Sequence, residues 1–340
     1  MSVSNSHEPE MPLTPNHEND YRARNSSIFI VNGYLYAILA VFIWSGFILV
    51  SRMGGISHLH PDDIVAIRYL ISSLILLPLW YFRFRFRLFD RKLVILSLTG
   101  GLAYSLSVYR GFELTPGSHA SLLLPGLLPL LMTSLAVGFK QKKNSRSQTL
   151  GLFTIFAGIL LLLFQKKGYS GNNLEGYLWI TAAAFSWSLF SVLIKHWKIN
   201  AWQATVSLSF YTCVFYLPFY LFSLTTRATP TDWSVLWPQI MLQGFYQGVL
   251  ASIVQMLLFV KAVEKIGTAN MGAMMGLVPL IAGTASIFLF SEPATSILVY
   301  GLILVSAGTF ISSGLLNQLN FFQRKNTGRQ HALRQYKNHQ

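Results

Sequence analysis

The chain has 340 residues, of which 52% are hydrophobic and 11% are charged, whereas an ordinary soluble domain has roughly 25% charged residues. This composition excludes a soluble fold, because a soluble domain of this size could not bury so much apolar surface. The formal charge of +14 does not indicate a nucleic-acid partner, because the basic residues lie between apolar runs and form no single basic face.

Ten predominantly apolar runs of membrane-spanning length follow one another along the chain. A bilayer core of about 30 Å requires roughly 20 apolar residues per helix, and peptide groups in hydrocarbon must bond within a helix. The sequence therefore predicts an all-α integral membrane protein of ten transmembrane helices. The predicted helices are 33–51, 62–82, 92–112, 118–139, 149–165, 176–195, 202–223, 236–260, 268–290 and 294–314.

The segments outside these runs are polar and basic. Residues 1–28 are rich in Ser, Asn, Glu and Pro and predict a disordered tail, and residues 320–340 form a basic tail. If the N-terminus is cytoplasmic, twenty of the 26 Lys and Arg residues fall on the cytoplasmic side and four on the opposite side. The positive-inside rule therefore predicts that both termini are cytoplasmic.

The two halves of the chain repeat each other. Gly33-Tyr-Leu recurs as Gly176-Tyr-Leu, Trp44-Ser recurs as Trp187-Ser, and a Gly-x-x-Pro pattern recurs about 150 residues later. Each half, 33–165 and 176–316, holds five predicted helices, so the second half must enter the membrane from the opposite side. Inverted five-helix repeats are typical of secondary transporters that alternate access to a central site.

Two stretches resemble the EamA module of the drug/metabolite transporter superfamily. The first, from Tyr109 to Leu163, contains Glu113-Leu-Thr-Pro-Gly, and the second, from Phe259 to Gly308, contains Ser291-Glu292-Pro293. The resemblance implies a ten-helix exporter of amino acids or other metabolites in the cell membrane, the bacterial inner membrane being the expected site. The chain departs from the family pattern after the fourth helix, where Phe139 and Lys140 replace a glutamate that Glu292 retains in the second copy.

Several residues are candidates for substrate binding. Trp44 and Trp187 lie near the middles of equivalent helices, away from the interfacial belts where tryptophan is common, and either line a central cavity or pack the two halves together. Polar side chains in apolar helices must face protein or a wet cavity, and they invite the same two interpretations. These are Tyr104, Gln243, Gln247 and Gln255, with Gln247 the preferred contact.

Charged residues and prolines suggest gates. Arg68 lies well inside the second helix and should face the interior, either pairing with Glu113 in a structural or gating role or binding an anionic group of the substrate. Arg110 with Glu113, and Lys261 with Glu264, are predicted ion pairs at equivalent helix ends. A proline frees a backbone carbonyl and bends a helix, so helix breaks are expected at Pro125, Pro129 and Pro279.

Other activities fit the sequence less well. A membrane enzyme would require a nucleophile with its base, or clustered acids and histidines, and Cys213 is the single cysteine. We therefore predict no catalytic residue, cofactor or metal. The expected partners are a small-molecule substrate and the lipid bilayer, with a homodimer left open. The alternative function is export of hydrophobic cations by a multidrug transporter, which would favour an intramembrane carboxylate that the sequence does not offer at mid-depth.

Overall fold

The computed structural model of the protein describes residues 15–138, 145–163, 173–227 and 233–314. Within these ranges every element of regular secondary structure is a helix, and no strand occurs. The predicted all-α class is therefore confirmed for the described part of the chain. Residues 1–14 and the predicted basic tail at 320–340 lie outside the described residues.

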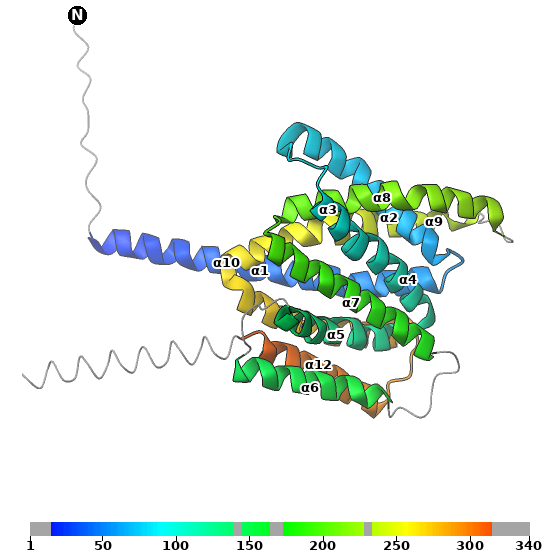
Figure 1. Ribbon diagram of the computed structural model, residues 1–340. Coiled ribbons are helices and arrows are strands. Elements are labelled where there is room, and N and C mark those ends of the chain that lie inside the picture. The colour runs from blue at the N-terminus through cyan, green and yellow to red at the C-terminus, as the bar shows by residue number, and fades with distance from the viewer. Residues whose placement is uncertain (1–14, 139–144, 164–172, 228–232, 315–340) are drawn as a thin grey trace, which may run out of the picture.

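Each apolar run of the first half coincides with a helical stretch (Figure 1). Residues 15–28, which the composition assigns to a disordered tail, are instead the first turns of α1, since extending an existing helix costs far less than nucleating one. The elements in order are α1 (Pro15–Gly55), α2 (Pro61–Leu79), η1 (Trp80–Phe84), α3 (Arg91–Leu96), η2 (Ser97–Ala103), α4 (Tyr104–Leu114), α5 (Gly117–Gly138) and α6 (Arg146–Leu163).

The second half repeats this order. Its helices are α7 (Asn173–Trp197), α8 (Ala201–Thr226), α9 (Trp233–Gln243), η3 (Gly244–Val254), α10 (Gln255–Met275), α11 (Leu277–Leu289) and α12 (Ser296–Ser312). The backbone leaves helical geometry at Gly267, whose φ of 81° is readily adopted only by glycine. This interruption separates the predicted helices 236–260 and 268–290.

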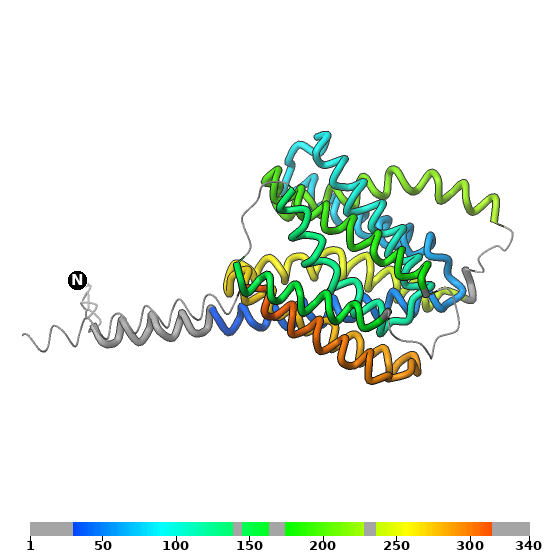
Figure 2. The backbone as a smooth tube through the Cα atoms, turned by 60° about the horizontal axis from the view of Figure 1, so that its bottom comes forward, coloured from blue at the N-terminus to red at the C-terminus, as the bar shows by residue number. Residues whose placement is uncertain are grey.

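Seven stretches of the described chain are long and apolar enough to cross a bilayer, and the shorter helices Arg146–Leu162 and Ser296–Ser312 are also apolar. The helices run in a broadly common direction, as a second view shows (Figure 2). The longest stretch, Leu236–Leu289, has 54 residues and includes the interruption at Gly267.

Two of the three π-helical segments occupy corresponding places in the two halves. The segment η2 joins α3 to α4, and η3 joins α9 to α10. Glycines in these segments allow close contacts: a Cβ atom on Gly100 would collide with the ring of Phe190, and one on Gly248 would lie 2.8 Å from the side chain of Ile71 in α2. Such π segments widen the helical turn and are frequent at functional sites.

Helices α6 and α12, which are equivalent in the two halves, pack side by side at one edge of the bundle (Figure 1). Gly151 lies against Gly308, and Gly158 lies against Gly301, so the two helices are antiparallel. Small residues let transmembrane helices approach until their backbones touch. The glycines that match across the repeat are therefore used for helix packing.

We expect Gly308→Ala to destabilise the folded protein, because the new Cβ would lie 2.7 Å from both the carbonyl oxygen of Gly151 and the backbone nitrogen of Ile155. Backbone atoms cannot move aside as a side chain can, and overpacking of this kind costs about 1–3 kcal/mol. Thermal unfolding in detergent should show a melting temperature several degrees lower. Gly138→Ala is the matched control, since no atom lies within 4 Å of its added Cβ, and equal melting temperatures for the two variants would contradict this packing.

Candidate functional site

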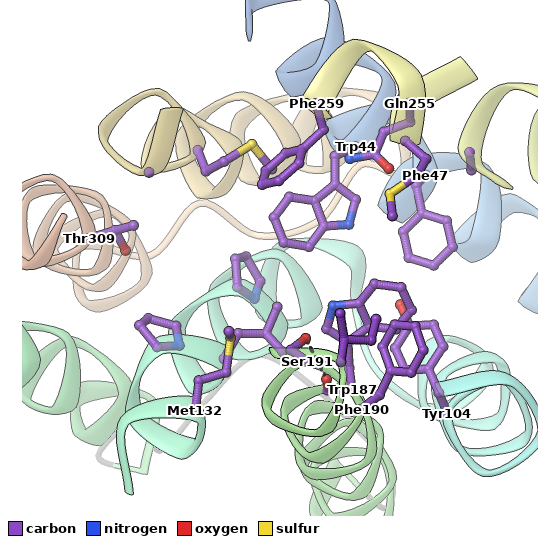
Figure 3. Close-up of a pocket in the computed structure, with 18 of the residues that line it drawn as sticks. Trp44, Phe47, Tyr104, Met132, Trp187, Phe190, Ser191, Gln255, Phe259 and Thr309 are labelled. Atoms are coloured by element: carbon purple, nitrogen blue, oxygen red, sulfur yellow. Dashed lines mark hydrogen bonds between the residues drawn. The ribbon is translucent and has the colours of Figure 1, made fainter. Parts of the chain in front are cut away.

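A cavity of about 600 Å³ lies in the middle of the bundle. Its walls come from α1, α2, α4 and α5 of the first half and from α7, η3, α10 and α12 of the second half. Aromatic and aliphatic side chains dominate the lining (Figure 3). A few hydroxyl and amide groups and one charged residue complete it. This size and chemistry suit a small organic molecule.

The cavity reaches toward one end of the bundle only. Lining residues of α5 lie between Pro125 and Thr133, in the middle of that helix, whereas its first turns from Gly117 to Leu124 are buried. Lining residues of α12 likewise begin at Thr309, near the end of that helix. The bundle is therefore packed shut at the end where α5 and α12 begin.

The two repeat-related tryptophans both line this cavity. Trp44 projects from α1 and Trp187 projects from α7 on the opposite wall (Figure 3). Trp187 also packs against two rings, with centroid distances of 4.8 Å to Tyr104 and 5.0 Å to Phe190. Tyr104, another predicted contact, is itself a lining residue. The structure thus places the predicted aromatic residues around one space, where a flat apolar group could lie between the two indoles.

Arg68 is the one charged residue in the cavity lining, within the part of the chain that the structure describes. Its side chain is 5% exposed and lies between two rings, with the guanidinium carbon 5.6 Å from the centre of Phe47 and 5.4 Å from that of Tyr69. Its Nε donates to the Ser252 hydroxyl at 3.1 Å, and its Nη1 donates to the Tyr109 hydroxyl at 3.1 Å. Cation–π contacts and hydrogen bonds hold the guanidinium in place.

The expected pairing of Arg68 with Glu113 is wrong. Glu113 instead forms an ion pair with Arg110, three residues earlier on the same helix, and no carboxylate lies within ion-pair distance of Arg68 among the described residues. The reason is the packing of η3: its glycines allow close approach to α2 and bring Ser252 to the guanidinium. The Ser252 hydroxyl also donates to the carbonyl of Gln247, five residues earlier in the π segment.

The three glutamines do not form one stripe along the cavity. Gln243 donates to the carbonyl of Val50, and Gln247 donates to the Ser51 hydroxyl and accepts from Tyr109. Both side chains are fully buried and bind to neighbouring helices, whereas Gln255 lines the cavity. Gln247, the preferred contact from the sequence, therefore lies behind the wall, where it supports Tyr109 and so the position of Arg68.

The second predicted ion pair is not formed in the described structure. Lys261 lies with its ammonium 5.7 Å from the ring centre of Tyr36, and no ion pair with Glu264 is present. Both residues instead line a second cavity of about 620 Å³, which shares Met256 and Val260 with the central cavity. The equivalent helix ends of the two halves therefore differ, since only Arg110 and Glu113 form the predicted ion pair among the described residues.

The predicted helix breaks are only partly seen. Helix α5 continues through Pro125 and Pro129, both of which line the cavity, so these prolines do not interrupt it. Neighbouring helices and small local adjustments can compensate for the bond that a proline removes. Pro279 lies in the first turn of α11, directly after the interruption at Gly276 between α10 and α11.

Sequence reasoning gave Glu292 no partner, but the structure gives it a specific position. The residue lies between α11 and α12 and accepts hydrogen bonds from two backbone N–H groups at the start of α5, those of Gly117 at 2.6 Å and Ser118 at 2.8 Å. A carboxylate at a helix N-terminus satisfies free N–H groups and interacts favourably with the helix dipole. Glu292 thus joins the two halves at the closed end of the bundle.

Sequence reasoning also missed much of the apolar lining. Phe47, Phe190 and Phe259 line the cavity together with Met132 (Figure 3). Phe47 and Phe190 each lie three residues after one of the paired tryptophans, so the repeat itself, followed by one helical turn, could have indicated them.

Comparison with known proteins identifies related transporters and a similar fold. The profile of the EamA-like transporter family matches residues 31–164 and again 174–314. Two Bacillus subtilis proteins are similar over much of their length: the uncharacterized transporter YetK, 24% identical over 72% of this chain and 76% of its own, and the uncharacterized transporter YyaM, 24% identical over 77% and 87%. A solved crystal structure superposes with a TM-score of 0.58 at 18% identity, covering 86% of this chain and 99% of its own, and so supports the fold.

Proposed function

Because the chain belongs to the EamA-like transporter family, within the drug/metabolite transporter superfamily, we propose that it exports a small metabolite, an amino acid or related compound, through the central cavity by alternating access. It is a multi-pass protein of the cell membrane, and the relatives described above are named as transporters. The proposal concerns the substrate class, the direction and the mechanism.

The observation that carries the proposal is the cavity between the two halves. Equivalent tryptophans of the two halves face it, and it opens toward one end of the bundle only. A transporter built from related halves can exchange the open and the closed end by rearranging those halves about a fixed site. The antiparallel packing of α6 with α12 supports an inverted relationship between the repeats.

We further propose ten crossings with both termini in the cytoplasm. At 1.5 Å per residue, the 54 residues of Leu236–Leu289 would extend about 80 Å as one helix, far more than a bilayer core of about 30 Å. That stretch therefore crosses twice, on either side of Gly267, and α6 and α12 supply the remaining crossings. In this orientation the closed end, with Glu292, faces outward.

The direct test of the function is export. The purified protein in proteoliposomes loaded with a mixture of labelled metabolites should release a defined subset faster than empty liposomes do, and overexpressing cells should accumulate the same subset in the medium. A protein that binds metabolites in detergent but releases none of them from liposomes would contradict the transport proposal.

The topology is tested by reporter fusions. A fusion after Lys143 and a fusion after Lys337 should both report the cytoplasm, and a fusion after Asn172 should report the opposite side, because the basic residues concentrate in alternate loops. An enzymatic reporter active only outside the cytoplasm, paired with one active only inside, gives opposite readings at each site. An external C-terminus would eliminate the arrangement of five plus five helices.

A further inference from the structure

We propose that the substrate is an organic anion, bound by a carboxylate on Arg68 with an apolar body between Trp44 and Trp187. This inference rests on the proposed function and names the chemical class that the cavity recognises. It is carried by the charge of the lining, in which Arg68 has no acidic counterpart among the described residues.

Within the described part of the chain, no acidic group neutralises the charge of Arg68 in the cavity wall. Removing a guanidinium from water is costly unless an anion pairs with it, and the residue is 5% exposed. Its two hydrogen bonds come from hydroxyl groups, which stabilise the ion but leave its full charge in place. An incoming carboxylate would supply the missing countercharge.

The guanidinium also retains free hydrogen-bonding capacity. Nε and Nη1 are engaged with Ser252 and Tyr109, whereas Nη2 has no hydrogen bond to any described residue. An arginine with a fixed plane and unused N–H groups is well suited to bind a carboxylate. These two hydrogen bonds position the guanidinium without a substrate. Binding therefore requires little further ordering of the Arg68 side chain.

The rest of the lining indicates the chemistry of the part of the substrate that lies away from Arg68. Trp44 and Trp187 lie on opposite walls, and the remaining lining residues are largely aromatic or aliphatic (Figure 3). An aromatic or aliphatic group fits there by burial of apolar surface. A cationic group would find no carboxylate in the described lining and would be repelled by Arg68, which disfavours export of hydrophobic cations.

Three probes that share a phenyl group on a short chain separate these possibilities: 3-phenylpropanoate, which is an anion; phenylalanine, a zwitterion; and 2-phenylethylamine, a cation. Binding to the purified full-length protein is measured by calorimetry, and flux is measured separately in proteoliposomes. We expect the two carboxylates to bind and the amine to bind at least tenfold more weakly. Amine binding equal to or tighter than that of 3-phenylpropanoate, or no binding of 3-phenylpropanoate at millimolar concentration, would overturn the proposal.

Variants then test the role of Arg68 itself. Loss of a charged hydrogen bond should weaken carboxylate binding about ten- to hundredfold in Arg68→Gln, leaving the amine unchanged or improved. Arg68→Lys, which keeps the charge without the planar group, should fall between, and the exposed Arg91→Gln is the matched control. Equal carboxylate affinity in folded Arg68→Gln would overturn the assignment. Carboxylate binding that depends on Arg68 without flux would instead contradict transport, so the two failures are distinguishable.

Discussion

Replacing Trp187 with alanine is expected to lower transport, measured as kcat/KM, about a hundredfold. The indole contributes one wall of the cavity, and its removal takes away on the order of 100 Å² of apolar contact with the substrate, or about 2.5 kcal/mol. Trp44→Ala should have a similar effect, because its indole lies on the opposite wall. The measurement is initial efflux from proteoliposomes at several substrate concentrations.

Two variants separate binding from packing. Trp187→Phe keeps a ring in contact with Tyr104 and Phe190 and should retain most of the transport. Trp237→Ala makes the same change at a side chain that is 58% exposed on the bundle surface, and it should leave transport unchanged. A melting temperature that falls in parallel with activity would show that the tryptophans mainly hold the two halves together.

Replacing Glu292 with glutamine is expected to open the closed end of the bundle. The carboxylate accepts two short hydrogen bonds from the start of α5, and bonds to a charged group contribute about 1.5–3 kcal/mol each. Glutamine has no charge and one acceptor oxygen in place of two, so it loses the charge-assisted strength of these bonds and cannot offer each N–H group its own oxygen. We expect the population in which this end is open to rise at least tenfold.

Thiol labelling measures this opening. Ser121 on α5 is fully buried in the closed end, so a Ser121→Cys reporter in a Cys213→Ala background should react slowly with a membrane-impermeant maleimide. Adding Glu292→Gln should raise the rate at least tenfold, whereas Glu175→Gln, at a carboxylate whose side chain is 44% exposed, should not. An unchanged labelling rate together with a lower melting temperature would reduce Glu292 to a structural helix cap.

The helical elements and the aromatic site could be predicted from the sequence for one physical reason. A bilayer imposes apolar length on each helix, so the runs at 62–82 and 202–223 coincide with α2 and α8 within a few residues. Trp44 and Trp187 were found because the repeat places both at the same depth, and depth within a helix is readable from the chain alone. Their facing arrangement required the structure.

The partners of Arg68 could not be predicted, because they depend on how two helices approach each other. Counting residues along ideal helices pointed to Glu113, whereas Gly244 and Gly248 bring η3 against α2 and place Ser252 at the guanidinium. The π segment also changes the rotation per residue. As a result, Gln255 and Gln247 face different surroundings. Gln255 lines the cavity, whereas Gln247 is buried outside the cavity lining.

The contact of Glu292 with the start of α5 could not be predicted from the sequence either, because the residues are far apart in the chain. Its two hydrogen bonds join positions 174 and 175 residues apart in the chain, and nothing in either local sequence specifies that contact. The loss of the equivalent glutamate in the first half was visible at Phe139 and Lys140, but the structural role of the surviving one was not.

In the proposed cycle, the charge of Arg68, which is the one charge in the described lining, would connect transport to the membrane potential. A carrier loaded with a monoanion would cross with its site neutralised, whereas the empty carrier would return with one positive charge in the site. A potential that is negative inside favours that inward return by up to about 2.3 kcal/mol per 100 mV for a charge that crosses the whole field. Export of the anion would then be electrogenic and would draw on the resting potential, without a separate coupling ion.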